Sequence, residues 1–387
     1  MIRLASVIDT FSTVFLTQYR DRLTSDHLRA LAAMKRCRTQ ASMQLQLQCS
    51  GCLHQARIPH SCGHRHCPHC QHHESQQWLE RQIRKQVPAE YFLLTFTLPA
   101  EFRGVAAAHP GTVYDLLLRC SWETVRTFTQ NDKQLQGTPG AIAVLHTNTR
   151  QLEFHPHVHL LMPAAAVDGT NKRWRTKGAT NRHRAKGGYL FCHQALAKVF
   201  RAKVLAAMTA ASLRLPLRHP RKWVVDCKSV GSGESALIYL GRYLYRGVIR
   251  EKDIVACADG QVTFRYRDGK TGKMMRRTVP GAQFLWLVLQ HVLPKGFRRA
   301  RNFGFLHPNC KRLIALLQVV LRVIPGAATA WVKARAPMVC PCCGAVMVIV
   351  RTRIRPPDSP PLAGTRPVPP VPLMPTASVA ARATLIM

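Results

Sequence analysis

The stretch that decides the fold lies at residues 154–162 and reads Phe-His-Pro-His-Val-His-Leu-Leu-Met. Residues two apart in a strand share one face, so His155, His157 and His159 are expected to project together, opposite the apolar residues between them. Two imidazoles at that spacing can hold one divalent cation and leave positions open for phosphate oxygens and water. The pattern predicts a metal-binding strand with His157 and His159 as ligands and His155 as an additional candidate. Pro156 removes one ladder hydrogen bond, which predicts a sheet edge or a bulge near residue 155.

Strand and helix patterns alternate on both sides of this stretch. β-branched and aromatic residues predict further strands at residues 91–98, 141–145, 223–225 and 261–266. Apolar residues at helical spacing predict helices at 113–129, 193–213 and 234–245. Paired strands with helices between some of them indicate an α+β domain built on an antiparallel sheet.

The helix expected at residues 234–245 carries a second set of reactive side chains. Tyr239 and Tyr243 stand four residues apart and share one helical face, while Arg242 and Arg246 form a neighbouring pair suited to holding phosphates. Two tyrosines at this spacing more often pack in a core. Beside a histidine strand in so basic a chain, we interpret them as nucleophiles.

The charge of the chain points to a polyanionic partner. Its 387 residues include 56 Lys and Arg against 19 Asp and Glu, a formal net charge of +37. Such a surplus favours binding to nucleic acid, with an anionic membrane surface as the weaker alternative. The longest strongly apolar stretch, 313–324, contains Gln318 and Arg322 and is shorter than the about 20 residues of a membrane span. With no signal-peptide pattern at the N-terminus, a cytoplasmic location is expected.

Two basic segments are expected to contact DNA phosphates. The first, residues 172–186, is interpreted as a mobile loop in which Trp174 stacks on bases; a solvated run of charge is the alternative. The second spans residues 295–301. The expected phosphate contacts are Lys172, Arg173, Arg175, Lys177, Arg182, Arg184, Lys186, Arg298, Arg299 and Arg301.

Clustered cysteines predict structural zinc. Cys49 and Cys52, followed after 14 residues by Cys67 and Cys70, give the spacing C-x2-C-x14-C-x2-C, and two such turns can complete a tetrahedron around one ion. A four-thiolate site without an open position serves folding. Three nearby residues are alternative ligands: Cys62, His64 and His66.

A second cluster, with Cys340, Cys342 and Cys343, resembles half of a zinc ribbon. A zinc site there would need distant ligands such as Cys310 or His307, so zinc site and plain turn both remain open. The other cysteines are interpreted as small buried hydrophobes: Cys37, Cys120, Cys192, Cys227, Cys257 and Cys310.

Three sets of residues, in their order along the chain, resemble the two-tyrosine rolling-circle transposases of the insertion sequence ninety-one family. They are the cysteine turns, His157-Val-His159 and Tyr239-Leu-Gly-Arg-Tyr243. The agreement takes in residues 60–70, 92–99 and 298–306, and it spans about residues 10–350. The resemblance implies a nuclease domain of the His-hydrophobic-His type with a ferredoxin-like antiparallel sheet. It also implies that the two histidines are the metal pair and the two tyrosines the nucleophiles, with the third metal ligand unplaced.

The function implied by this resemblance is a transposase that nicks and rejoins single-stranded DNA at insertion-element ends through a 5′-phosphotyrosine intermediate. Its cofactors are expected to be structural Zn²⁺ and catalytic Mg²⁺ or Mn²⁺. Its expected partners are the single-stranded element ends, target DNA and, because no helicase motif is present, a host helicase. Two alternatives remain: a plasmid or phage rolling-circle replication initiator with the same chemistry, and a non-catalytic zinc-containing nucleic-acid-binding protein.

Composition divides the chain into four expected regions. Residues 1–90 form a helical, zinc-binding and DNA-binding domain, and residues 91–300 the nuclease domain. Residues 301–350 form a basic, helical segment with the second cysteine cluster. Residues 351–387 form a proline-rich tail that is expected to be extended and mobile.

Overall fold

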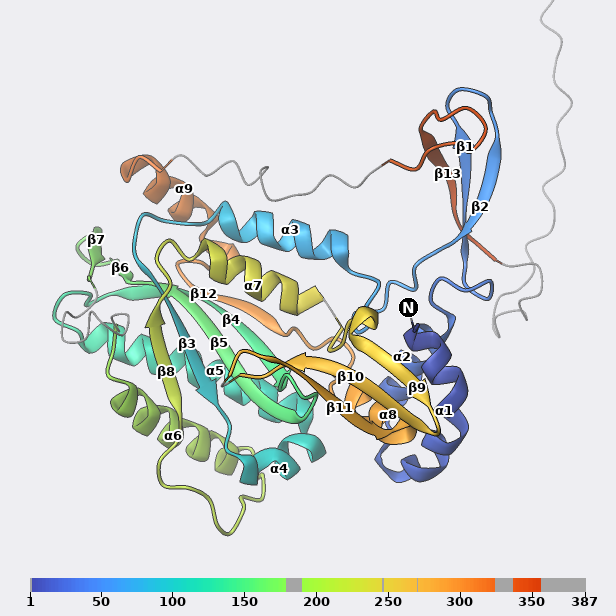
Figure 1. The fold of residues 1–387 in the computed structure, drawn as a ribbon. Coiled ribbons are helices and arrows are strands. Elements are labelled where there is room, and N and C mark those ends of the chain that lie inside the picture. Colours follow the sequence, from blue (N-terminus) through green and yellow to red (C-terminus); the bar gives the residue numbers. More distant parts are fainter. Residues whose placement is uncertain (1, 179–189, 246, 270, 324–336, 356–387) are drawn as a thin grey trace, which may run out of the picture.

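The computed structural model describes residues 2–178, 190–245, 247–269, 271–323 and 337–355. Its centre is a large sheet with helices on both faces (Figure 1). The largest sheet has seven strands in the order β7-β6-β4-β5-β3-β8, with β12 also paired to β4. All six strand pairings within it are antiparallel. The expected α+β fold on an antiparallel sheet is confirmed.

The core of this sheet has the connectivity β-α-β-β-α-β. In chain order its elements are β3 (Tyr91–Thr97), α5 (Pro110–Asn131), β4 (Thr138–Asn148), β5 (Phe154–Pro163), α6 (His193–Ala210) and β8 (Val225–Ser229). In space the strands run β8-β3-β5-β4, so the fourth lies beside the first and the third lies between the first and the second. This is the ferredoxin-like arrangement that the family resemblance implied.

Alternation along β5 assigns its two faces to different layers. Val158, Leu160 and Met162 are buried in the cluster that α5 and α6 complete. Leu161, on the opposite face, joins a second cluster with residues of α3 (His72–Ile83), α7 (Glu234–Tyr245) and α9 (Lys311–Val320). His157 and His159 share the face of Leu161 and therefore lie in the layer of α7.

β5 is a central strand, paired with β3 on one side and with β4 on the other. Of the two expectations raised by Pro156, the edge is wrong and the bulge is confirmed. The register shift lies between the pairs His146–His157 and Asn148–Phe154, where β5 has one residue more than β4. The carbonyl of Pro156 still accepts the Leu98 N–H at 3.2 Å, so only the donor that proline lacks is missing from the ladder.

Helices α3 and α7 lie side by side on the outer face of the sheet (Figure 1). The Ser75 hydroxyl donates to the Gly241 carbonyl at 3.0 Å. A Cβ placed on Gly241 would lie 3.2 Å from the Trp78 ring, so a glycine lets the two helices approach closely. The contact joins a helix of the first 90 residues to the helix that carries both tyrosines.

The N-terminal helices pack against residues that follow α7. α1 (Leu4–Gln18) and α2 (Ser25–Arg36) share one buried cluster with α8 (Gly281–Leu289) and a three-stranded sheet. That sheet comprises β9 (Ile254–Ala258), β10 (Gln261–Arg267) and β11 (Met274–Pro280). The structure therefore does not follow the expected boundary at residue 90, because part of the 91–300 region completes the core of the N-terminal helices.

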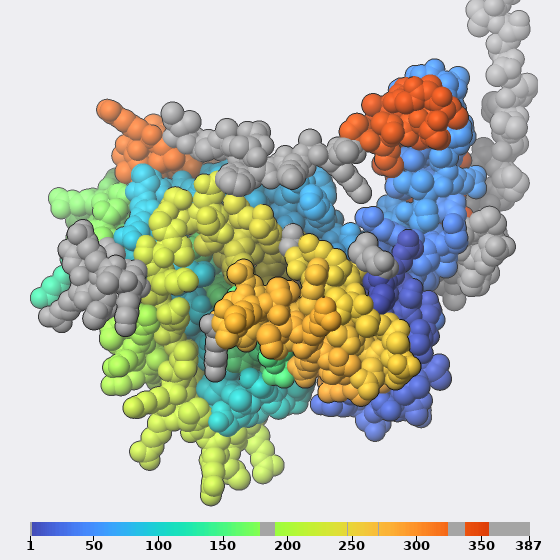
Figure 2. Space-filling model, in the orientation of Figure 1, coloured from blue at the N-terminus to red at the C-terminus, as the bar shows by residue number. Residues whose placement is uncertain are grey.

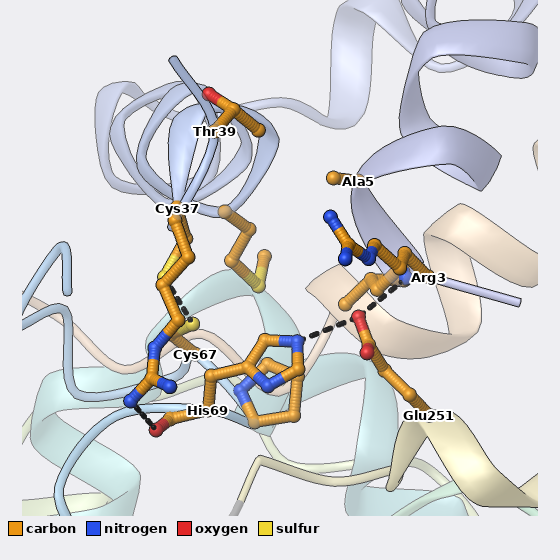
Figure 3. A pocket seen from close by; sticks show the side chains of 11 residues that line it. Arg3, Ala5, Cys37, Thr39, Cys67, His69 and Glu251 are labelled. Atoms are coloured by element: carbon orange, nitrogen blue, oxygen red, sulfur yellow. Dashed lines mark hydrogen bonds and ion pairs between the residues drawn. The ribbon is translucent and has the colours of Figure 1, made fainter. Parts of the chain in front are cut away.

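A pocket of about 230 Å³ marks this junction, between the start of α1, the end of α2 and the turn at residues 67–69 (Figure 3). Glu251 is buried there, and its Oε1 accepts the Leu4 N–H at 2.6 Å. The same oxygen lies 2.7 Å from His69 Nε2, and this hydrogen bond raises the pKa of His69. Glu251 thus accepts a hydrogen bond from a backbone N–H in the first turn of α1 and links that turn to His69 in the cysteine-rich turn.

A smaller three-stranded sheet stands apart from the main body and joins distant segments of the chain. β1 (Gln44–Cys49) lies between β2 (Gln55–Pro59) and β13 (Met347–Ile354), all antiparallel. Figure 2 shows the red-orange C-terminal residues packed on this blue N-terminal hairpin. We call these three strands and their turns the split ribbon.

The expected 301–350 segment is therefore divided between two places. β12 (Ala300–Gly304) and α9 belong to the main body, while the cysteine turn near residue 340 and β13 belong to the split ribbon. β13 also continues beyond residue 350 to Ile354. The remainder of the proline-rich tail, from residue 356, lies outside the described residues.

Most of the expected elements are confirmed as β3, β4, β5, β10, α5, α6 and α7. The strand expected at residues 223–225 begins only at Val225, because Trp223 is buried edge-on against Phe102 and Phe200. The remaining elements are short: η1 (Arg20–Arg22), η2 (Ala100–Phe102), α4 (Arg103–Ala108), β6 (Ala165–Asp168), β7 (Arg173–Thr176), η4 (Glu251–Asp253) and η5 (Pro308–Cys310). Among the described residues, no helix combines the length and the apolar character that crossing a membrane requires.

We expect Gly304→Ala to lower the free energy of unfolding by more than about 3 kcal/mol. Gly304 has φ +58°, and a Cβ at this position would lie 1.7 Å from the Pro139 carbonyl oxygen on β4. The matched control is Gly111→Ala in α5, where no atom lies within 4 Å of an added Cβ and a gain of about 0.4–1 kcal/mol is expected. Urea denaturation followed by circular dichroism measures both, and a Gly304→Ala change below about 0.5 kcal/mol would contradict the close β12–β4 pairing.

Candidate active site

Three histidines meet on the face of the main sheet that α7 covers. His157 and His159 come from β5, and His146 comes from β4, where it lies directly opposite His157 in the register. One ring nitrogen of each lies within 4.8 Å of the others. The ring centroids are 4.2 Å apart for His146 and His159, and 5.2 Å apart for His146 and His157. We call these residues the histidine triad.

Hydrogen bonds engage Nδ1 of His157 and of His159, whereas none among the described residues engages Nε2 of His146. His157 Nδ1 lies 2.7 Å from the carbonyl oxygen of His155, which can only accept, so Nδ1 carries the proton and Nε2 is a lone-pair donor. His159 Nδ1 is 3.1 Å from the Thr95 hydroxyl. Nε2 of His146 is buried without any hydrogen-bond partner in the part of the chain that the structure describes. An orphaned buried nitrogen and two outer hydrogen bonds of this kind fit a metal site.

Burial keeps the triad in the neutral form that binds metals. It lowers the pKa of His157 to about 4 and that of His159 to about 3, and it holds the pKa of His146 well below its ordinary value. Neutral imidazoles offer lone pairs at neutral pH without competition from protons. Three such donors on one side of an ion leave further coordination positions open.

His155 does not join the triad, so the expectation that it adds a ligand is not met. Its Nδ1 lies 2.9 Å from the guanidinium of Arg103, which can only donate, so this nitrogen is already used as an acceptor. The third histidine is instead His146, which the sequence patterns did not select. The expected strand at residues 141–145 stopped one residue short of it, although Ile142, Val144 and His146 alternate onto one face.

α7 brings its two tyrosines to the triad in different environments. Tyr239 is 49% exposed, and its ring centroid lies 6.0 Å from that of His159 and 6.1 Å from that of His146. Tyr243 stacks on His146, with centroids 3.3 Å apart and rings 11° from parallel. Its hydroxyl accepts the Thr147 N–H at 3.3 Å and donates to the Asn148 side chain. Burial raises the pKa of both phenols.

Arg299 is half-buried and packs against the ring of Tyr243, so its expected role as a phosphate contact stays a prediction. Its guanidinium carbon is 5.1 Å from the centre of the Tyr243 ring, and Nη1 donates to the Leu244 carbonyl at 3.3 Å. Burial lowers the pKa of this arginine. Its positive charge opposes the rise in the pKa of Tyr243 that burial causes.

Several other expected phosphate contacts are used within the protein. Arg175 pairs with Asp168 at 2.9 Å, Lys177 pairs with Asp132, and Arg301 pairs with Asp115 at 2.5 Å. Trp174 packs edge-on against Phe305, with centroids 5.5 Å apart, instead of standing free for base stacking. The cause is β7, which folds the start of the expected mobile loop back onto β6.

The remaining expected contacts fall into two sets. Four are exposed: Lys172, Arg173, Arg242 and Arg298. Four lie outside the described residues: Arg182, Arg184, Lys186 and Arg246.

The cysteines form two groups of four, and the expectation that the two C-x2-C turns share one ion is wrong. One group is Cys37, Cys62, Cys67 and Cys70; the other is Cys49, Cys52, Cys340 and Cys343. The turns separate because the β1–β2 hairpin carries the earlier one into the split ribbon. Of the cysteines expected to be small buried hydrophobes, Cys120 and Cys227 are buried, Cys257 and Cys310 are half-buried, Cys192 is exposed, and Cys37 belongs to a group.

The first group has the geometry of a tetrahedral thiolate site. Cys37 Sγ is 3.6 Å from Cys70 Sγ and 3.5 Å from Cys67 Sγ, and Cys62 Sγ is 3.6 Å from Cys70 Sγ. Bonds of about 2.3 Å to one zinc ion would set sulfurs about 3.8 Å apart. Cys62, expected as an alternative ligand, is a full member.

Comparison with known proteins identifies both parts of the chain. Residues 7–98 match the family described as "Transposase zinc-binding domain", and residues 140–313 match the family described as "Putative transposase". The "Putative transposase y4qJ" of Sinorhizobium fredii (strain NBRC 101917 / NGR234) is 31% identical over 326 residues, which cover 78% of this chain and 79% of that protein. The chain belongs to the IS91 family of transposases.

Two further similarities are weaker. The "Transposase for insertion sequence element IS801" of Pseudomonas savastanoi pv. phaseolicola is 29% identical over 265 residues, which cover 66% of this transposase and 63% of that one. The solved structure "Conjugative Relaxase TrwC in complex with mutant OriT Dna" is 16% identical with a TM-score of 0.22, covering 34% of this chain and 48% of that one. The family that the sequence resembled is thus confirmed, and this transposase contains a zinc-binding domain.

Proposed function

We propose that this IS91-family transposase cuts and rejoins single-stranded DNA through a covalent link between a DNA 5′-phosphate and Tyr239. The observation that carries the proposal is the exposed phenol of Tyr239 beside three neutral histidines, each of which has a ring nitrogen within 4.8 Å of the others. A nucleophile within reach of a metal-binding group is the arrangement that phosphodiester transfer requires.

The histidine triad fits a divalent ion, Mg²⁺ or Mn²⁺, held by the free nitrogens of His146, His157 and His159. When bound, such an ion supplies Lewis-acid polarisation of the scissile phosphate. The Tyr239 oxygen forms the new bond to phosphorus while the bond from phosphorus to the 3′ oxygen breaks. The phenol proton leaves to solvent and the departing 3′ oxygen takes up a proton. The link retains a phosphoester, so the reverse reaction can rejoin the strand without ATP.

Tyr243 would perform the second transfer, as a rolling-circle mechanism with two tyrosines requires. In this structure its hydroxyl is engaged by Thr147 and Asn148, and its ring is covered by His146. Burial raises the pKa of Tyr243, and the charge of Arg299 offsets part of that rise. We infer that Tyr239 acts first and that Tyr243 acts after it has left the Asn148 side chain.

The remaining site residues divide into contacts to DNA and structural ligands. The exposed Arg242 lies on α7 beside the tyrosines, and we assign it, with Lys172, Arg173 and Arg298, to the DNA phosphates. Cys37, Cys62, Cys67 and Cys70 would hold the zinc ion of the zinc-binding domain. With no open position, that ion would stabilise the fold.

We expect the protein to form a covalent adduct with single-stranded DNA carrying an element end when Mn²⁺ is present, and to form none after treatment with EDTA. Labelled DNA that comigrates with the protein on a denaturing gel measures the adduct, and the freed 3′-hydroxyl strand measures the cut. Duplex DNA of the same sequence is the control. Cleavage that persists in EDTA, or that leaves no DNA on the protein, would exclude this mechanism.

A further inference from the structure

The second cysteine group combines two segments that lie far apart in the sequence. Cys49 and Cys52 lie on the turn between β1 and β2, while Cys340 and Cys343 lie on the turn that precedes β13. The four sulfur atoms all lie within 4.8 Å of one another. Two of these ligands lie far outside residues 7–98, which match the zinc-binding family.

The sulfur positions fit one tetrahedral ion and do not fit disulfides. Cys49 Sγ is 3.4 Å from Cys343 Sγ, and Cys52 Sγ is 3.7 Å from Cys340 Sγ. A disulfide would bring two sulfurs to about 2.05 Å, whereas a shared zinc ion would hold them about 3.8 Å apart. Each of the two close pairs takes one cysteine from each turn.

The two turns have the same local form, which directs both cysteines of a turn towards one point. The residue after the second cysteine adopts a left-handed conformation in both, with φ 62° at Leu53 and φ 74° at Gly344. Backbone N–H groups of Gly51 and Cys52 donate to Cys49 Sγ at 3.3 and 3.4 Å. In the other turn, the Cys342 N–H donates to Cys340 Sγ at 3.4 Å. Such bonds favour the thiolate, the form that binds zinc.

Apart from the cysteines, little holds the split ribbon together. Its buried cluster has four members, Leu47, Cys49, Cys340 and Met347. Domains with so few buried side chains usually need a metal or disulfides to fold. The ribbon does gain backbone pairing, because β13 continues the sheet beside β1 and the Ser50 N–H donates to the Val346 carbonyl at 3.1 Å.

We propose that Cys49, Cys52, Cys340 and Cys343 bind a second structural zinc ion, which closes the split ribbon and fastens the C-terminal segment to the N-terminal hairpin. The proposal is independent of the cleavage mechanism. It gives the protein two zinc ions, one held within residues 37–70 and one shared between residues separated by as many as 294 positions.

Zinc counting on the purified full chain tests this assignment. We expect mass spectrometry of the metal content to find two zinc ions in the parent protein and one in the pair variant Cys340→Ser with Cys343→Ser. The pair variant Cys49→Ser with Cys52→Ser should also retain one. The variant with all four substitutions should still retain one, because both pairs serve the same ion. Cys342→Ser is the matched control, since Cys342 lies in the same turn but outside the group, and it should retain two.

Three results would overturn the assignment: a single zinc ion in the parent protein, a loss of both ions in the fourfold variant, or a loss of one ion in Cys342→Ser. Circular dichroism of each variant checks that the main body remains folded, which we expect because its core does not share residues with the ribbon cluster. Cobalt substitution gives a second readout, in which the thiolate absorption of the pair variants should fall to half of the parent value.

Discussion

Tyr239→Phe is expected to reduce the rate of single-strand cleavage by more than about a thousandfold and to abolish the DNA–protein adduct, because it removes the hydroxyl that we propose as the nucleophile and little else. The ring would keep its contacts with His146 and His159, so the fold and the triad should be unchanged. Single-turnover cleavage of end-labelled DNA in Mn²⁺ measures the rate, and a denaturing gel measures the adduct.

Tyr243→Phe is the matched control for that experiment and should behave differently. It removes the hydroxyl bonded to Thr147 and Asn148 but leaves Tyr239 in place. The first cut and its adduct should therefore persist within about tenfold of the parent rate, while transfer to a second strand should fail. A first cut lost in Tyr243→Phe and kept in Tyr239→Phe would reverse the order that we propose. Equal loss in both variants would show that neither tyrosine acts alone.

His146→Ala is expected to weaken Mn²⁺ binding by at least about a hundredfold. Removing a residue that only orients a metal ligand typically lowers the metal affinity by about 10–100-fold, and removing a ligand itself should lower it at least as much. Cleavage should fall with the loss of metal and recover in part at high Mn²⁺ concentration. Calorimetric titration of the protein with Mn²⁺ measures the affinity without reference to activity. His146 is also buried against Tyr243, so a thermal melt in the absence of metal separates a loss of packing from a loss of ligand.

His155→Ala provides the comparison, because His155 lies on the same strand but contacts Arg103 instead of the triad. Its Mn²⁺ affinity should stay within about threefold of the parent value, as expected for a residue that does not hold the ion. An affinity loss in His155→Ala that equals the loss in His146→Ala would mean that the third ligand comes from β5 and not from β4.

The features that the sequence predicted correctly are those encoded within single elements. Alternation along β5 predicted that His157 and His159 share a face, although it wrongly included His155, and the four-residue spacing predicted that Tyr239 and Tyr243 lie together on α7. His146 could not be found in this way, because its place depends on the register between β4 and β5 and on the bulge between His146 and Asn148. A register is a property of two strands, and one local pattern does not determine it.

The cysteine groups and the basic residues illustrate the same limit over longer distances. Regular spacing suggested that Cys49, Cys52, Cys67 and Cys70 share one ion, yet the partners of the first pair lie as many as 294 positions away. Positive charge suggested that Arg299 faces DNA, but β12 begins at the next residue and Arg299 packs against the ring of Tyr243. A local sequence pattern shows which ligands or charges a residue can offer, whereas tertiary packing determines which partners that residue meets.

The contact between α3 and α7 has a consequence for how these proteins can diverge. The hydroxyl of Ser75 and the ring of Trp78 set the distance at which the tyrosine helix rests, and α3 follows the Cys67–Cys70 turn directly. Residues 7–98 and 140–313 match separate families, yet the α3–α7 contact joins them directly. We expect that a chimaera with its zinc-binding domain from one relative and residues 140–313 from another would place Tyr239 and Tyr243 incorrectly, because α3 and α7 would no longer fit each other. Substitutions on the two helices should therefore arise together.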